Sequence, residues 1–319
     1  MSISSFFKLI EIQTKVASVI PYLLGTVFAL YKFDNFKIKE AVLLFLGMII
    51  FDMTVTAINN YVDYKKAIKK EGFGYEEHNA IGKDKLNPSL VLKVIIGMLT
   101  LATVLGIALF LNTDCAVLVV GIICFGIGIC YSFGPIPISR TPFGEIFSGF
   151  TMGCLITFLA VYVHIYDQGI INLQLTKEFF NVSLNIKVLA SIFIISLPAI
   201  AGIANIMLAN NICDIEEDIV NKRYTLPIYI GKSAALGVFK WIYYIGFISV
   251  IIGVLVGVLP LVSILTFIAF KPVHRHIKVF FALQSKAETF ILAVKNFVLM
   301  NVIYIITIIV GYIIQLFRA

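Results

Sequence analysis

Charged residues are scarce in this chain. Asp, Glu, Lys and Arg make up only 13% of its 319 residues, whereas soluble domains average roughly a quarter. Hydrophobic residues account for 60% of the sequence, and the mean hydropathy is +0.99. So few charged residues cannot cover the water-exposed surface of a 319-residue protein. The composition therefore excludes an ordinary soluble protein and favours a membrane protein.

The motifs of several common functional classes are missing. The five cysteines form no C-x-x-C pair and are expected to be small packing residues in apolar segments. The four histidines do not form a metal-ligand set, and His274 and His276 flank Arg275 in what is expected to be a solvated basic loop. No P-loop or Gly-rich nucleotide fingerprint is present, so ATP chemistry is not expected.

Long apolar runs dominate instead. A membrane-spanning helix needs about 20 apolar residues, and we expect nine spans, at about 16–31, 41–60, 89–111, 115–132, 143–165, 187–210, 234–257, 259–270 and 297–317. The eighth run is short, and a re-entrant segment is its alternative. The predicted fold is an all-α, multi-pass membrane protein of about nine transmembrane helices around a central, cytoplasm-facing cavity, with residues 1–319 forming a single membrane-embedded domain.

The net charge of +7 is distributed unevenly between the loops. With the N-terminus inside, the inside segments carry 17 Lys and Arg and the outside segments carry 6. The positive-inside rule accounts for this asymmetry, so the basic balance does not call for a nucleic-acid partner. The loop after each even-numbered span is therefore predicted to be cytoplasmic, and the plasma membrane is the expected location.

Two polar segments echo each other at the cytoplasmic ends of apolar runs. They read AINNYVDYKKAIKKE at 57–71 and LANNICDIEEDIVNK at 208–222. Each carries two Asn followed by Asp three residues later, in the same topological position. Membrane folds are often built from two similar halves, and the repeat indicates motif-bearing halves of about 1–135 and 136–319.

On a helix, each motif places its oxygen-bearing side chains on one face. At about 100° per residue, Asn210, Asp214 and Asp218 fall within 80° of one another, and Asn59 and Asp63 fall within 40°. The residues expected to face elsewhere are Asn60, Asn211 and Glu216. Ordinary solvated helix ends are the alternative, but they explain poorly why Asn and Asp recur at i and i+4 in both copies.

The chemistry of these side chains indicates a magnesium site. Carboxylate and amide oxygens are hard ligands, and Mg²⁺ typically takes one or two carboxylates together with waters and substrate phosphates. Two facing motifs would suit two Mg²⁺ ions bridged by a diphosphate. Cations follow each motif, and Lys66, Lys222 and Arg223 are candidates for binding phosphate oxygens.

These motifs resemble those of the UbiA superfamily of intramembrane prenyltransferases, which carry N-D-x-x-D-x-x-x-D after the second span and D-x-x-x-D after the sixth. Three further segments, YSFGPIPISRTPFGE (131–145), NKRYTLPIYIG (221–231) and KVASVIPYLLGT (15–26), resemble the 1,4-dihydroxy-2-naphthoate polyprenyltransferase branch, which makes menaquinone precursors. The resemblance extends to about residue 232.

The chain departs from the family pattern at a few positions. Asn60 stands where the family often has Asp, and Ala67 where many members have a third acid. Tyr224 replaces a basic residue of the branch, which makes Arg223 the stronger candidate for a diphosphate contact. How the first motif compensates for Asn60 and Ala67 is left open by the sequence.

The resemblance implies Mg²⁺-dependent transfer of a polyprenyl group from its diphosphate to an aromatic acid, with membrane lipid around the enzyme. The residues implied as catalytic and metal-binding are Asn59, Asp63, Asp214 and Asp218. The residues implied to bind substrate are Lys15, Lys66, Tyr131, Arg140, Asn210, Lys222 and Arg223. Lys15 and Arg140 are candidates for an acceptor carboxylate, with a purely topological role as the alternative.

Two alternatives remain at this point. One is the same chemistry on another acceptor, such as 4-hydroxybenzoate. The other is a secondary transporter with a cation site near the midplane of the bilayer. The acidic motifs lie at the cytoplasmic ends of their spans, and both copies enter from the same side, which disfavours the transporter.

Overall fold

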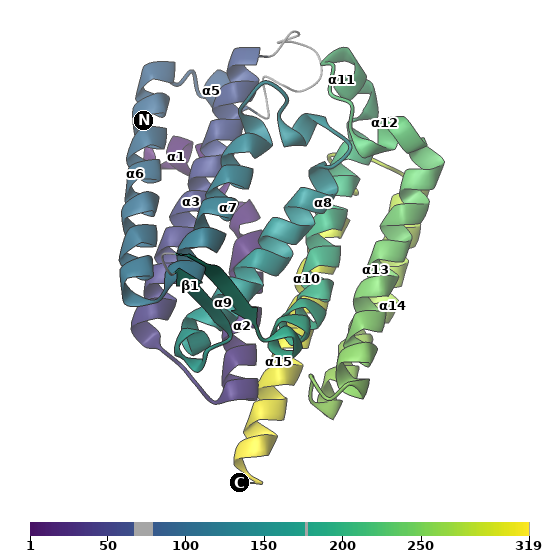
Figure 1. Ribbon diagram of the computed structural model, residues 1–319. Helices are drawn as coiled ribbons and strands as arrows, with labels where there is room; N and C mark the ends of the chain where they lie inside the picture. The colour runs from purple at the N-terminus through teal and green to yellow at the C-terminus, as the bar shows by residue number, and fades with distance from the viewer. Residues whose placement is uncertain (67–78, 176–177, 319) are drawn as a thin grey trace.

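The computed structural model describes residues 1–66, 79–175 and 178–318. Long helices pack side by side into one bundle (Figure 1). The long helices are α2 (Val16–Phe33), α3 (Ile38–Lys66), α6 (Pro88–Asn112), α7 (Cys115–Ser132), α10 (Ile186–Cys213), α13 (Lys232–Leu255) and α15 (Ile291–Leu316). The shorter ones are α1 (Ile3–Leu9), α5 (Ala80–Lys83), α8 (Gly144–Ser148), α9 (Ile156–Ile165), α11 (Ile215–Val220), α12 (Leu226–Ile230) and α14 (Phe270–Ala282).

Short helical pieces join these elements. The 3₁₀ segments are η1 (Ile12–Lys15), η2 (Ile138–Arg140), η4 (Tyr166–Gln168) and η5 (Leu261–Ala269), and η3 (Gly149–Leu155) is a π-helix between α8 and α9. Within the described residues, eight helical segments are long and apolar enough to cross a membrane. The predicted helical membrane protein is therefore confirmed, whereas the count of nine is not.

Local signals set several of the span boundaries. Asn87 accepts a hydrogen bond from the Ser89 backbone amide, and Pro88 follows at the first turn of α6. Asp114 accepts from the amides of Ala116 and Val117 at the start of α7. Side-chain oxygens of this kind accept hydrogen bonds from amides that the first helical turn leaves without partners, and they thereby fix where a helix begins. Both α6 and α7 begin within a residue of the predicted starts.

The eighth predicted span differs from the expectation. The run 259–270 forms η5, and the chain continues as α14 through the stretch 271–282 that was predicted as a cytoplasmic loop. Val273, Ile277 and Phe280 explain this result, because their i, i+4, i+7 spacing buries one face of α14. The intervening Lys, Arg and His residues concealed the pattern in the sequence.

A β-hairpin interrupts the all-α architecture. Strand β1 (Ile171–Leu175) pairs antiparallel with β2 (Phe180–Leu184), and Ile171 lies opposite Leu184. The Asn185 amide donates to the carbonyl oxygen of Ile170 at 2.8 Å, which closes the hairpin before α10 begins. The hairpin occupies the loop between the fifth and sixth spans, and the apolar-run analysis did not predict it.

The two sequence motifs meet at one end of the bundle. In Figure 1, α5, α11 and α12 lie at this end, and the C-terminus lies at the other. The helices α3 and α10 both finish here, at Lys66 and Cys213. The fold thus brings together polar residues that are about 150 positions apart in the chain.

Small residues allow several helices to pack closely. A Cβ on Gly25 of α2 would lie 2.5 Å from the carbonyl oxygen of Thr157 in α9, and one on Gly153 of η3 would lie 2.6 Å from the backbone nitrogen of Ile200 in α10. Backbone atoms cannot move aside as a flexible side chain can. Both positions therefore require glycine, and they fix the packing of α2 and α10 against the segment Gly144–Gln168.

We expect Gly25→Ala to destabilise the protein by about 1–3 kcal/mol, because overpacking a close helix contact forces the backbones apart. The matched control is Gly97→Ala on α6, where nothing lies within 4 Å of the added carbon. Thermal melting of the two purified variants in detergent compares them. Equal melting temperatures would contradict the close contact between α2 and α9.

Candidate functional site

A large polar chamber lies where the two motifs meet. Its volume is about 1730 Å³. The motif residues along its lining are Asn59, Asn60, Asp63, Asn210, Asp214, Glu216, Glu217 and Arg223. The structure therefore brings the two halves of the predicted site together around one space.

The spacing predicted a single helix for the second motif, but the structure divides it into two. Helix α10 ends at Cys213, Asp214 stands at the junction with φ −100° and ψ 9°, and α11 starts at Ile215. Two i→i−4 hydrogen bonds nevertheless continue across the break, from the Asp214 amide to Asn210 O at 3.1 Å and from the Asp218 amide to Asp214 O at 2.8 Å. Asn210 and Asp214 therefore stay adjacent, whereas Asp218 turns inward and is buried.

Each of the three predicted carboxylates has a cationic partner from another segment. Asp63 Oδ1 lies 3.8 Å from a guanidinium nitrogen of Arg140, and Asp218 Oδ1 lies 3.2 Å from Nε of Arg223. Asp214 pairs with the ammonium of Lys286, in the connection between α14 and α15. Each of these three carboxylates is thus paired with one cation.

Asp218 is the buried acid of the three. Its burial raises the pKa of the carboxyl to about 6, and the nearby Arg223 guanidinium only partly offsets this effect. Thr225 donates a further hydrogen bond to its Oδ2 at 3.1 Å. Asp218 is therefore held inside the protein beside Arg223, one layer behind the chamber surface.

The first motif presents Asn59 to the chamber and uses Asn60 for structure. Asn59 Oδ1 accepts a hydrogen bond from Ser132 Oγ of α7 at 2.9 Å. The Asn60 amide donates to the carbonyl of Leu9 at 3.0 Å and to Glu11 Oε1 at 3.1 Å. Asn60 thereby ties α3 to the N-terminal segment, which gives a structural role to the residue that departs from the family pattern.

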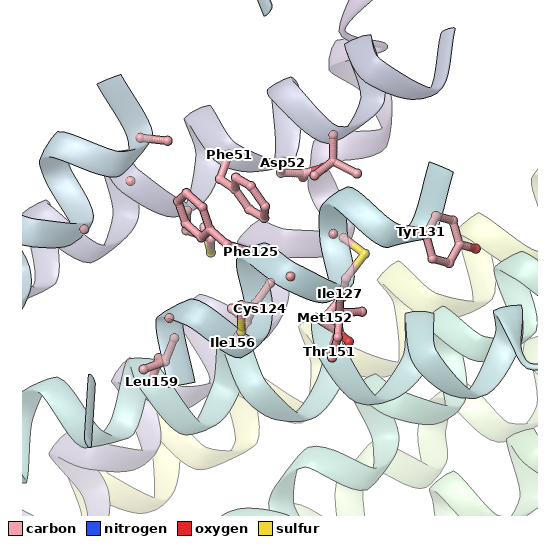
Figure 2. Close-up of a pocket in the computed structure, with 18 of the residues that line it drawn as sticks. Phe51, Asp52, Cys124, Phe125, Ile127, Tyr131, Thr151, Met152, Ile156 and Leu159 are labelled. Atoms are coloured by element: carbon pink, nitrogen blue, oxygen red, sulfur yellow. The ribbon is translucent and has the colours of Figure 1, made fainter. Parts of the chain in front are cut away.

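A second, apolar cavity of about 690 Å³ adjoins the polar chamber. Figure 2 shows Tyr131 at one end of its labelled lining and Leu159 at the other, with Phe51 of α3 and Phe125 of α7 between them. These two rings stack with centroids 3.9 Å apart. The cavity is thus an aromatic and aliphatic pocket enclosed mainly by α3, α6, α7 and the segment Gly144–Gln168.

The two cavities share residues at their junction. Asn59 and Tyr131 line both, as do Glu11, Thr14 and Met207. The Tyr131 hydroxyl is buried and has no hydrogen-bond partner within the described part of the chain. A molecule with a charged head and an apolar tail can therefore lie across the junction, beside Tyr131 and Asn59.

Lys15 stands at the N-cap of α2, at the start of the first span, and its side chain turns into the protein. Its ammonium is buried and contacts Asp52 Oδ1 at 2.8 Å and Thr56 Oγ1 at 2.6 Å. Ser18 Oγ donates to the other carboxylate oxygen of Asp52 at 2.6 Å. Asp52 and Thr56 line the apolar cavity, whereas Lys15 does not. Lys15 therefore contributes to the site by holding these two lining residues in position.

Sequence reasoning missed Asp52 and Lys286. An acidic residue inside the apolar run 41–60 was a usable signal for Asp52, because ionisable groups within a membrane span are rare and usually functional. Lys286 gave no such signal, since it stands among several cations in a stretch predicted to be a positive-inside loop.

The remaining residues named from the sequence have three different outcomes. Lys222 is exposed, adopts a left-handed backbone conformation with φ 54°, and is not among the residues lining either cavity. Glu216, expected to face elsewhere, is exposed at the chamber lining. The side chain of Lys66 and all of Ala67 lie outside the described residues.

The donor set fits a hard divalent cation. Across residues 1–66, 79–175 and 178–318, no three His, Cys, Asp or Glu side chains group closely enough to hold an ion by themselves. Mg²⁺ does not need such a cage, since waters and substrate phosphates complete its shell. The Lys286 ammonium already lies between Asn210 Oδ1, at 2.6 Å, and Asp214 Oδ2, so this oxygen pair does hold a cation.

Comparisons with known proteins agree with this architecture. Residues 18–288 match the model of the UbiA prenyltransferase family. The chain is 28% identical over 315 residues to 1,4-dihydroxy-2-naphthoate octaprenyltransferase of Bacillus subtilis (strain 168), covering 96% of this chain and 91% of that protein.

Two solved structures share the fold. A UbiA homologue from Aeropyrum pernix K1 superposes with a TM-score of 0.67 at 16% identity, covering 91% of this chain and 97% of that one. A UbiA homologue from Archaeoglobus fulgidus bound to GPP and Mg²⁺ gives a TM-score of 0.64 at 13% identity, covering 96% and 99%. The family match spans most of the chain and agrees with its membrane-spanning helices, so this integral membrane protein belongs to the UbiA prenyltransferase family of enzymes.

Proposed function

We propose that the protein transfers a polyprenyl group from polyprenyl diphosphate to 1,4-dihydroxy-2-naphthoate with loss of CO₂, in menaquinone biosynthesis. The observation that carries the proposal is the junction between a charged chamber and an apolar cavity at Asn59 and Tyr131. This shape suits a prenyl diphosphate, whose head is anionic and whose chain is hydrocarbon. Membership of a prenyltransferase family argues against the transporter alternative.

The diphosphate head belongs in the polar chamber. Asn59, Asp63, Asp214 and Asp218 are the proposed residues for holding Mg²⁺. The first three line the chamber, whereas Asp218 would have to turn from its buried position beside Arg223 to reach the ion. When bound, Mg²⁺ neutralises the charge that develops on the leaving diphosphate. The guanidinium groups of Arg223 and Arg140 lie beside these carboxylates and offer charge-assisted hydrogen bonds to phosphate oxygens.

The prenyl chain belongs in the apolar cavity. Phe51 and Phe125 line its wall, together with Ile107 of α6 and Ile122 of α7. Breaking the allylic C–O bond sends its electron pair to the diphosphate and leaves a carbocation near the junction. A water-poor lining protects that cation from capture as the prenyl alcohol, and aromatic faces stabilise it by about 0.5–2 kcal/mol each.

The acceptor belongs between the junction and the Lys15–Asp52 pair. A ring carbon of the acceptor forms the new C–C bond, and the electron pair of the carbon–carboxylate bond restores aromaticity as CO₂ leaves. Tyr131 lines the cavity at this point. Thr56 and Asp52 supply polar groups in the lining of the same cavity, with Lys15 balancing the charge. The cytoplasm is the proposed side of this chamber, because the Lys and Arg asymmetry places the motif ends inside.

A product assay tests the proposal. Membranes containing the protein are incubated with labelled polyprenyl diphosphate and either 1,4-dihydroxy-2-naphthoate or 4-hydroxybenzoate, with Mg²⁺ or with EDTA. We expect a prenylated naphthalene product and released CO₂ only with the naphthoate and Mg²⁺. A product formed from 4-hydroxybenzoate alone would assign the other acceptor, and turnover in EDTA would contradict the metal requirement.

A further inference from the structure

Lys286 lies outside every motif that the sequence or the family resemblance identified, yet it lines the polar chamber. It belongs to the connection between α14 and α15, 72 residues beyond Asp214. Its ammonium donates to Asn210 Oδ1 at 2.6 Å and pairs with Asp214. The Asn210 amide also donates to Asp214 Oδ2 at 3.2 Å, so the three side chains form one cluster.

This position overlaps with the place proposed for a metal ion. Asp214 is a proposed Mg²⁺ ligand, and its carboxylate pairs with the Lys286 ammonium. A metal ion and an ammonium cannot lie closely against the same carboxylate oxygen, because like charges a few ångströms apart repel strongly. A divalent ion at Asp214 would therefore displace Lys286.

The displaced ammonium would remain inside the chamber. Lys286 is one of its lining residues, as is Arg223, and its flexible stem allows the ammonium to move by several ångströms. The group that arrives with the metal is a diphosphate, whose oxygens are strong acceptors for an ammonium. The number of ion pairs is therefore conserved. Asp214 exchanges Lys286 for the metal ion as its partner, and Lys286 exchanges Asp214 for the diphosphate.

We propose that Lys286 is a diphosphate-binding residue that neutralises Asp214 until metal and substrate arrive. This inference rests on the proposed function, since it takes a prenyl diphosphate as the substrate. It assigns a part in substrate binding to the last two helices of the bundle, which carry no recognised motif.

The test measures two affinities on the full-length protein in detergent. The first is Mn²⁺ alone, followed by electron paramagnetic resonance. The second is farnesyl thiodiphosphate, a poorly reactive donor analogue, in the presence of Mn²⁺. We expect Lys286→Met to bind Mn²⁺ alone a few-fold more tightly than the wild type, and to bind the analogue about tenfold or more weakly. Lys286→Arg should restore most of the analogue affinity.

Lys37→Met is the control. Lys37 forms an ion pair with Asp167 and lines neither the polar chamber nor the apolar cavity. The change removes one lysine and one ion pair away from the proposed site. We therefore expect both affinities of Lys37→Met to match the wild type.

Two results would overturn the proposal. In one, Lys286→Met leaves both affinities unchanged, so the ion pair is an ordinary surface pair. In the other, Lys286→Met weakens Mn²⁺ binding as well, so Lys286 supports the metal site rather than competing for it. Failure of the wild type to bind the analogue at all would refute the proposed function itself, a result distinct from either of these.

Discussion

Replacing Asp214 with alanine should reduce turnover by about 10²-fold or more while leaving the protein folded. The change removes a carboxylate from the chamber that is proposed to hold Mg²⁺ and the diphosphate. Losing one well-placed group that stabilises developing charge typically costs 10²–10³ in rate. Asp214 stands at a helix junction and is partly exposed, so its loss leaves no cavity in the core.

Asp63→Ala should have an effect of similar size, because Asp63 lines the same chamber from α3. Asp84→Ala is the control, since it also removes an acid that pairs with an exposed lysine at this end of the bundle. Initial rates at saturating substrate, with circular dichroism to verify folding, separate the variants. If Asp84→Ala lost as much activity as Asp214→Ala, the motif carboxylates would have no special role.

Replacing Asp52 with alanine should destabilise the protein by about 3–5 kcal/mol, because it leaves the buried ammonium of Lys15 without its counter-ion. Only 5% of the Lys15 side chain is exposed. Asp52 is also its only acidic partner within the described residues. Lys15→Met should cost less, since Asp52 keeps its hydrogen bond from Ser18.

The double variant Lys15→Met/Asp52→Leu provides the decisive comparison. Replacing both members of a buried ion pair with apolar residues is often neutral, so we expect the double variant to melt close to the wild type. The melting temperature of each variant in detergent gives the order of stability. A double variant as unstable as the sum of the single ones would show that the pair is not coupled.

The apolar runs alone determined that the chain spans a membrane. A backbone in hydrocarbon must satisfy its own hydrogen bonds, so runs of this length form helices. The residue types of the two motifs likewise indicated hard oxygen ligands for Mg²⁺ before any contact was known. The same reasoning failed for α14. The residues of its apolar face, Val273, Ile277 and Phe280, are separated by cationic residues in the sequence.

Only the tertiary structure decided which charges meet. Lys15 binds Asp52 across 37 residues, and Lys286 binds Asp214 across 72. Such pairs depend on how helices pack, to which glycines such as Gly25 and Gly153 contribute through close backbone contacts. A helical pattern gives the face on which a side chain lies but not the neighbour that this face meets. The sequence therefore determined that the chain is a helical membrane protein and predicted the chemistry of the site, while the packing of the helices decided its ion pairs and the cavity that adjoins them.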